Sequence, residues 1–421
     1  MLPIRNRLMS GDLDDTLLYL YGDALEAQKV KYAALADAFE GAFGDSDDAA
    51  LFSAPGRSEI GGNHTDHQLG RVLAAAVTMD TRAVVAPRSD RIVRIHSQGY
   101  TPLCVSLDNL SPNASEENAS EALVRGIAER FAQIGYQIGG FDAVTASDVP
   151  KGSGLSSSAA FSILVSTIFS ELYNAGRISP VEQALASKYA ENKHFGKPSG
   201  LMDQLACAVG GFIAIDFEQP EEPKIEKIDC DLSALGYAIC IINCGGNHAD
   251  LTPEYAAVTK EMGDVARYFG KTVLREVDES LFYASLGQLR KSVSDRSILR
   301  AMHFFGDNAR VPEQAAALKR NDIETFRQLM NESGNSSFTM LQNVCPTDAS
   351  ERGLALALAL SQRMLEGKGA WRVHGGGFAG TIQALVPLNM VAAYQAEMEK
   401  AFGQGCCYRF AVRPVGGVRI G

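Results

Sequence analysis

A short run of glycine and serine at residues 150–160 is the segment whose composition most clearly suggests chemistry. It reads Pro-Lys-Gly-Ser-Gly-Leu-Ser-Ser-Ser-Ala-Ala, and an apolar helical pattern follows it. The glycines let the backbone approach a ligand closely, and a helix start offers free N–H groups to an anion. A glycine-rich turn with a serine cap is the simpler alternative, but three consecutive serines exceed what capping needs. The run has neither the Gly-Lys-Ser/Thr end of a P-loop nor a third fingerprint glycine, so it predicts phosphate binding of another type.

A polar segment at residues 55–67 gathers side chains that suit a polyol or a metal ion. It reads Pro-Gly-Arg-Ser-Glu-Ile-Gly-Gly-Asn-His-Thr-Asp-His, with one guanidinium, two imidazoles and two carboxylates around a glycine-rich turn. A polar surface loop is the plainest interpretation. His64, Asp66 and His67 suggest a metal site, but no further His or Cys cluster with ligand spacing accompanies them. Sugar hydroxyls need acceptors such as Asp66 beside donors such as His64 and Arg57, so polyol binding fits better.

Two further segments add carboxylates and glycines. Residues 191–204 end in a glycine-led turn, Gly-Leu-Met-Asp-Gln, where Asp203 is a candidate base and Glu191 a candidate ligand of Mg²⁺. Carboxylates are usually only solvated, so this segment is weak alone. Residues 374–380, His-Gly-Gly-Gly-Phe-Ala-Gly, indicate a hairpin or bulge where the backbone approaches something closely.

The elements that must position these residues follow from the hydrophobic pattern. Helices are predicted over 12–44, 122–135, 159–173, 181–194, 254–269, 313–331 and 351–366. Strands are predicted over 49–54, 72–77, 82–86, 91–96, 141–147, 210–217, 238–243, 380–387 and 407–413. A chain of 421 residues favours two domains. The polar loop 218–224 is the best boundary, giving 1–217, with 1–44 as a helical extension, and 218–421.

Composition narrows the possible partners. The chain has 39 Lys and Arg against 50 Asp and Glu, a net charge of -11, which excludes a broad cationic surface for nucleic acid. That acidity does not exclude a local site for a phosphate. No apolar run reaches the roughly 20 residues of a membrane span, and the first ten residues do not resemble a signal peptide. Eight scattered cysteines are typical of reduced thiols, so we expect no membrane partner and a cytoplasmic location.

Together the four segments resemble the kinases of the GHMP superfamily, and specifically the galactokinases. The match extends in the family's order from about residue 51 to the C-terminus. Arg57 with His64-Thr-Asp66 resembles the sugar signature, residues 148–160 the ATP loop, and residues 200–204 the segment with the catalytic aspartate. Residues 375–380 resemble the third motif, which supports the phosphate loop, and residues 407–412 the closing strand.

The resemblance implies an α+β, two-lobed fold, with an N-terminal lobe like ribosomal protein S5 domain 2 and a ferredoxin-like C-terminal lobe. It implies ATP-dependent phosphorylation of a monosaccharide, galactose first, at the anomeric hydroxyl, with ATP and Mg²⁺. Asp203 would accept or orient the hydroxyl proton, and Arg57 would keep the Asp203 carboxylate ionised. The implied sugar-binding residues are Asn63, His64, Asp66, Gly200 and Tyr255. The implied ATP-binding residues are Lys151, Gly152, Ser153, Gly154, Leu155, Ser156, Ser157 and Ser158, and the implied Mg²⁺ ligands are Ser158 and Glu191.

Two departures from the family pattern bear on the substrate. Asn63 stands where galactokinases usually carry a glutamate, and His67 where most have a tyrosine. A neutral amide at residue 63 either weakens galactose binding or admits a C6-modified sugar such as galacturonic acid, whose carboxylate a glutamate would repel. A non-catalytic sugar sensor is a second alternative, although the intact Ser158-Ala-Ala favours an enzyme. A GHMP kinase for a non-sugar alcohol such as mevalonate or homoserine ranks last, because the sugar signature is present. Oligomeric state stays open.

Overall fold

Two long antiparallel strands, β1 and β2, form the centre of the larger sheet. The computed structural model describes every residue except 1–3, 151–153, 198, 247–250 and 349. In the described part, this sheet has eight strands in the order β12-β1-β2-β5-β3-β4, with β6 pairing with β2 and β7 with β6. The strands are β1 Ala50–Gly61, β2 Arg71–Pro87, β3 Ile92–Ser97, β4 Leu103–Ser106, β5 Phe141–Ser147, β6 Phe212–Asp216, β7 Lys224–Ile228 and β12 Val418–Arg419.

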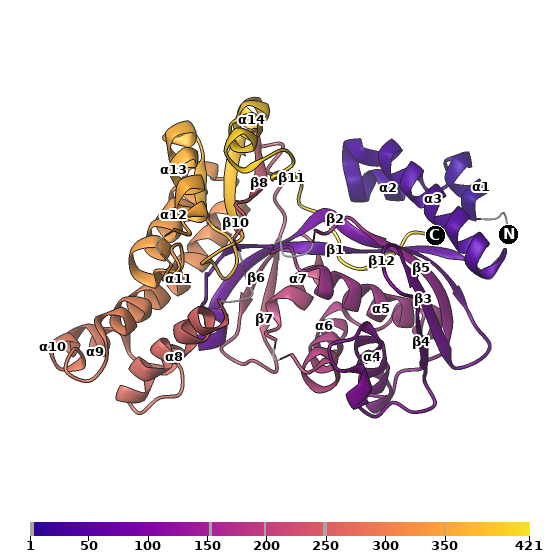
Figure 1. Ribbon diagram of the computed structural model, residues 1–421, viewed down its shortest axis with the longest axis horizontal. Coiled ribbons are helices and arrows are strands. Elements are labelled where there is room, and N and C mark those ends of the chain that lie inside the picture. Colours follow the sequence, from indigo (N-terminus) through magenta and orange to yellow (C-terminus); the bar gives the residue numbers. More distant parts are fainter. Residues whose placement is uncertain (1–3, 151–153, 198, 247–250, 349) are drawn as a thin grey trace.

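Helices cover both faces of this sheet, so its central strands are apolar on both sides (Figure 1). Alternate residues of a strand point to opposite faces. Phe52 and Ala54 of β1 therefore pack into the core beneath α4 to α7, whereas Leu51, with Val84 of β2, packs into the core beneath α1 to α3. These helices are α1 Ile4–Ser10, α2 Asp14–Tyr21, α3 Leu25–Phe43, α4 Ser120–Gln133, α5 Ser157–Asn174, α6 Pro180–Ala190 and α7 Met202–Val209.

The N-terminal segment forms three helices, whereas the sequence predicted one helical stretch over 12–44. Gly22 has φ +54°, which glycine adopts without a steric penalty, and a 3₁₀ turn at Gly22–Ala24 separates α2 from α3. Beneath these helices, the Tyr21 hydroxyl donates a hydrogen bond to buried Asp80 of β2 (2.5 Å). Lys31 of α3 pairs with Asp148 (2.5 Å), directly before the glycine and serine run. The N-terminal helices thus contact the base of the predicted phosphate loop.

The smaller sheet lies beside α13 and α14, above the larger sheet in the view of Figure 1. It is antiparallel, in the order β11-β8-β10-β9, with α13 and α14 packed against it. Its strands are β8 Tyr237–Asn243, β9 Ala370–Val373, β10 Thr381–Pro387 and β11 Cys407–Phe410. The helices of this half are α8 Thr252–Tyr268, α9 Glu279–Ala284, α10 Leu286–Leu289, α11 Asp295–Lys319, α12 Ile323–Ser336, α13 Gly353–Leu365 and α14 Val391–Phe402.

Three predicted elements differ from the structure. β1 continues through residues 55–61, which the sequence indicated as a turn, because two irregularities in its register absorb the local distortion while pairing with β2 persists. β2 is one continuous strand over Arg71–Pro87, where two were predicted. The predicted helix over 313–331 is the end of α11 and the start of α12, because the Asp322 carboxylate caps a new helix by accepting from the Thr325 N–H.

The architecture is α+β with two lobes, as expected. The division at residue 218 stays a prediction, and two later segments belong to the larger sheet: β7 pairs with β6, and β12 returns to pair with β1. In the described part of the chain, no helix combines the length and apolar character needed to cross a membrane.

Candidate active site

Two adjoining cavities lie at the end of β1, where segments from both lobes meet. The larger has a volume of about 490 Å³ and the smaller about 200 Å³. Asp66, Gly200 and Met202 line both, so the cavities meet at these residues. The larger cavity is also lined by Arg57, Glu59, His64, His67, Lys188 and Tyr255, and the smaller by Ser158, Glu191, Lys197, Asp203 and Gln204. The cavities therefore bring together eight of the thirteen predicted site residues that the structure describes.

Asp203 lies in the first turn of α7 and accepts three hydrogen bonds. Arg57 donates from Nε to Oδ1 (2.7 Å) and from Nη2 to Oδ2 (2.6 Å), and Ser156 Oγ donates to Oδ2 (2.6 Å). Burial raises the pKa of Asp203, but the charge of Arg57, the Ser156 hydrogen bond and the charge of Lys197 outweigh it, so the pKa is below its ordinary value. The carboxylate is therefore ionised at neutral pH, and its side chain remains 32% exposed.

The described part of the glycine and serine run leads into the N-terminus of α5. Ser156 has φ +59°, and Ser157 and Ser158 begin this helix of eighteen residues. The first N–H groups of a helix have no partner within it and favour an anion. Ser158 is exposed and lines the smaller cavity, so the helix start opens where a phosphate would lie beside Asp203. The predicted ligands Lys151, Gly152 and Ser153 lie outside the described residues.

The turn after β9 supports this loop from the other lobe. Gly154 lies against His374, and a Cβ at residue 154 would come within 3.0 Å of the imidazole. The Gly154 carbonyl accepts a hydrogen bond from Arg57 Nη1, and the Leu155 carbonyl accepts from the Arg57 backbone N–H (3.0 Å). The Leu155 side chain is fully buried. Any contact of Leu155 with a nucleotide would therefore involve its backbone.

Ser158 and Glu191 share the smaller cavity and form a donor set that suits Mg²⁺. Glu191 begins a π-helical turn after α6, is buried, and accepts a hydrogen bond on Oε2 from Gln204 Nε2 (2.8 Å). Gln204 Oε1 is buried there and has no hydrogen-bond partner among the described residues. No group of three or more His, Cys, Asp or Glu side chains that could hold a metal occurs in the described part of the chain. One or two protein oxygens are enough to hold Mg²⁺ when phosphate and water supply its other ligands.

Asp66, at the junction of the cavities, is the acceptor that the sugar interpretation requires. Its carboxylate has no hydrogen bond or ion pair to any described residue. A Cβ on Gly200 would lie 3.2 Å from Asp66 Oδ2, which explains the glycine. His67 lines the same wall, and burial lowers its pKa to about 4, so its imidazole is neutral at physiological pH. A wall that combines a carboxylate acceptor with a neutral imidazole suits a hydroxylated ligand.

His64 and Tyr255 are held by the turn at 374–380. His64 Nε2 donates to the Gly376 carbonyl (2.9 Å), and Tyr255 Oη donates to the Gly377 carbonyl (2.9 Å). Burial lowers the pKa of His64, which leaves Nδ1 of its neutral ring as an acceptor. A Cβ on Gly376 would approach the Tyr255 ring to 2.5 Å, so a side chain there would displace the tyrosine. Segments about 310 residues apart in the chain thus build one wall.

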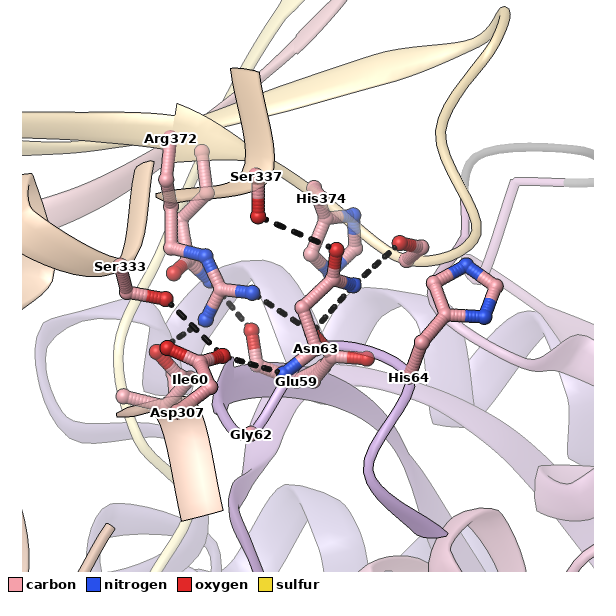
Figure 2. A network of polar contacts seen from close by, with 12 residues as sticks. Glu59, Ile60, Gly62, Asn63, His64, Asp307, Ser333, Ser337, Arg372 and His374 are labelled. Atoms are coloured by element: carbon pink, nitrogen blue, oxygen red, sulfur yellow. Dashed lines mark hydrogen bonds and ion pairs between the residues drawn. The ribbon is translucent and has the colours of Figure 1, made fainter. Parts of the chain in front are cut away.

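Asn63 lines neither cavity. It is fully buried and donates a hydrogen bond to Glu59 (Figure 2), and Glu59 lines the larger cavity. The sequence assigned residue 63 to the sugar and did not consider Glu59 or Lys188. The strand period could have indicated Glu59, because residues two apart on a strand share a face and Arg57 is on β1. No sequence signal indicated Lys188, which lies near the end of α6.

Comparisons with known proteins give two sequence matches and several similar structures. Residues 37–87 match the galactokinase galactose-binding signature, and residues 122–211 match the GHMP kinases N-terminal domain. A galactokinase from Lactococcus lactis, solved with galactose, has a TM-score of 0.78 at 23% identity, covering 93% of this chain and 100% of that one. A mevalonate kinase from Methanococcus jannaschii has a TM-score of 0.61 at 15% identity, covering 87% of this chain and 99% of that one.

A third similar structure is a D-glycero-D-manno-heptose 1-phosphate kinase from Bacteriodes thetaiotaomicron. It has a TM-score of 0.59 at 15% identity, covering 87% of this chain and 97% of that one. These likenesses confirm the predicted fold, and the two sequence matches confirm the family recognised from the motifs. Residues 37–87 thus carry the galactose-binding signature of the galactokinases, and residues 122–211 carry the N-terminal domain of the GHMP kinases.

Proposed function

We propose that this protein transfers the γ-phosphate of ATP to the anomeric hydroxyl of a monosaccharide, with galactose as the first candidate. The observation that carries the proposal is the position of Asp203. Its ionised carboxylate lines the smaller cavity beside the α5 N-terminus, and this cavity adjoins the larger one, which is lined by Asp66, His64 and Tyr255. A sugar hydroxyl and a terminal phosphate would therefore meet at one carboxylate.

In this proposal, the sugar oxygen forms a bond to the γ-phosphorus while the bond from that phosphorus to the leaving ADP oxygen breaks. The hydroxyl proton passes to Asp203 or is oriented by it. Arg57 holds the carboxylate with a two-pronged contact and places positive charge beside the transferred group. The α5 N–H groups and the Ser157 hydroxyl would bind phosphate oxygens. Ser156, expected among the phosphate ligands, donates to Asp203 and so orients the carboxylate.

Ser158 and Glu191 would hold Mg²⁺, which when bound offsets phosphate charge. The protein's net charge of -11 does not oppose this ligand, because the site offers backbone N–H groups, Arg57 and Lys197 locally. A cytoplasmic site of action is part of the proposal, since all eight cysteines are free thiols.

A coupled assay of ADP release tests this function. The panel contains galactose, galacturonate, N-acetylgalactosamine and arabinose, each with ATP and Mg²⁺, and Asp203→Asn serves as the matched variant. We expect turnover of a neutral sugar by the wild type and a loss of at least 100-fold in Asp203→Asn. Full turnover by that variant would refute the role of Asp203. Sugar binding without ADP release would favour the non-catalytic sensor, and turnover of galacturonate alone would favour the C6-modified substrate.

A further inference from the structure

The hydrogen bonds of Asn63 leave it no capacity for a ligand. Its Nδ2 donates to Glu59 Oε1 (3.0 Å) and to the Gly375 carbonyl (2.7 Å). Its Oδ1 accepts from Ser337 Oγ (3.3 Å) and from Asn343 Nδ2 (2.8 Å). A primary amide has two donor hydrogens and two acceptor lone pairs, and all four are used inside the protein. Figure 2 shows Asn63 between two of these partners, Glu59 and Ser337. The neutral residue at position 63 is therefore no guide to the substrate.

Glu59 has only one of its two oxygens engaged. Oε1 accepts from Asn63 Nδ2 and from Arg372 Nη2 (2.7 Å), and that guanidinium is fully buried. Oε2 has no partner among the described residues, and it is not one of the enclosed polar atoms that lack a partner. The side chain lines the larger cavity. A free carboxylate oxygen is therefore available to a molecule in that cavity.

The surrounding network fixes the direction of this carboxylate. The Asn63 N–H donates to Asp307 Oδ2 of α11 (2.8 Å), and Ser333 of α12 donates to the same oxygen (3.2 Å) (Figure 2). Arg372 of β9 also donates from Nη1 to the Ile60 carbonyl (2.6 Å). The end of β1 and the turn after it are thus tied directly to α11 and β9 of the other lobe, and Ser333 of α12 supports Asp307. A carboxylate held this way loses little freedom when a ligand binds, which favours affinity and specificity.

We propose that Glu59 is a specificity-determining residue that accepts a hydrogen bond from a sugar hydroxyl other than the one that is phosphorylated, and that it directs the site to neutral sugars over uronic acids. The inference rests on the proposed sugar kinase function. The hydroxyl that is phosphorylated would contact Asp203, which lines the adjoining cavity, and not Glu59. A substrate carboxylate would face both Glu59 and the unpaired Asp66, and such repulsion opposes binding.

The carboxylate of a uronic acid would pair with the ammonium group of Lys188. This lysine lines the same cavity and has no hydrogen bond or ion pair to any described residue. Glu59 and Asp66 would thus repel the carboxylate of a uronic acid, whereas Lys188 would attract it. We expect the repulsion to be the larger effect, and the neutral sugar to be preferred, because Glu59 is rigidly held. The comparison of Glu59→Gln with Lys188→Met separates the two outcomes.

The test combines a protein change with a substrate change. Wild type and Glu59→Gln are assayed with galactose and with its 2-, 3-, 4- and 6-deoxy analogues. We expect Glu59→Gln to lower kcat/KM for galactose by about 10- to 100-fold, chiefly through KM, with KM for ATP unchanged. With the one analogue that lacks the bound hydroxyl, the variant and the wild type should be equal. An equal loss on every sugar would show that Glu59 acts only through the fold and would overturn the proposal.

Two further arms keep the result interpretable if Glu59→Gln is unstable. Ser337→Ala removes one hydrogen bond of the network outside the cavity, so it should lower activity equally, if at all, on every sugar. The wild type should prefer galactose to galacturonate, and Lys188→Met should keep that order. Preferred turnover of galacturonate that Lys188→Met abolishes would overturn the inference. A wild type inert with every sugar would instead contradict the proposed function.

Discussion

Replacing Arg57 with methionine tests the arrangement around Asp203 most fully. The change removes two charge-assisted hydrogen bonds, at 2.7 Å and 2.6 Å, and the contact to the Gly154 carbonyl. Breaking a buried pair costs about 3–5 kcal/mol, and because the Asp203 side chain is 32% exposed we expect about 2 kcal/mol of lost stability. Losing one preorganised charge beside a transferred phosphoryl group should lower kcat by about 10²–10³-fold.

The same variant should change the pH dependence in a defined direction. Burial raises the pKa of Asp203 and Arg57 is the largest opposing influence, so the pKa must rise when Arg57 is removed. The acid limb of kcat/KM, which marks protonation of the base, should therefore move to higher pH. Arg57→Lys keeps the positive charge but loses the two-pronged hydrogen bond of the guanidinium. It should therefore move the acid limb of kcat/KM less than Arg57→Met does.

The assay is ADP release measured from pH 4.5 to 9, with circular dichroism to confirm folding. Ser156→Ala is the matched control, because it removes one hydrogen bond to the same Asp203 oxygen without removing a charge. A variant Arg57→Met with wild-type kcat and an unmoved acid limb would refute the reasoning about Asp203.

Three further predictions follow from other parts of the structure. Glu191→Gln should raise the Mg²⁺ concentration for half-maximal rate at least several-fold while leaving KM for the sugar unchanged; unaltered Mg²⁺ dependence would contradict its role. Lys31→Met should raise KM for ATP more than KM for the sugar, because Lys31 and Arg82 together hold Asp148 at the base of the phosphate loop; equal effects would contradict this. The free energy of unfolding, measured in urea, should fall as the pH drops from about 6.5 to 4. Buried His67 has its pKa lowered to about 4, so over that range the unfolded chain binds a proton that the folded chain excludes; constant or rising stability would contradict this.

Much of the candidate site was predictable because its residue types are constrained by chemistry. Arg57, Asp66, Asp203 and Ser158 belong to segments whose glycines, hydroxyls and charges stand out from any structural requirement. The structure brings these four to two adjoining cavities. The alternation of apolar residues likewise predicted most strands of the larger sheet, although not their lengths.

The remainder depends on features that the local pattern does not contain. Glu59 rather than Asn63 reaches the cavity because β1 continues beyond the expected turn, and strand continuation decides which side chains share a face. Asn63 is drawn away by partners about 245 to 310 residues distant, such as Asp307 and Gly375. Lys188 reaches the cavity from α6, whose placement depends on its packing against α4, α5 and α7. Contacts between residues so far apart in the chain cannot be predicted from the residues next to them in the sequence.

The most direct test of the central claim is the identity of the product. Wild-type protein is incubated with ATP, Mg²⁺ and ¹³C1-labelled galactose, and the product is examined by ¹³C and ³¹P NMR. We expect one equivalent of ADP for each sugar consumed and a carbon–phosphorus coupling at C1, both lost in Asp203→Asn. Phosphate on any other carbon, or a C1 resonance without coupling to phosphorus despite ADP release, would contradict the account.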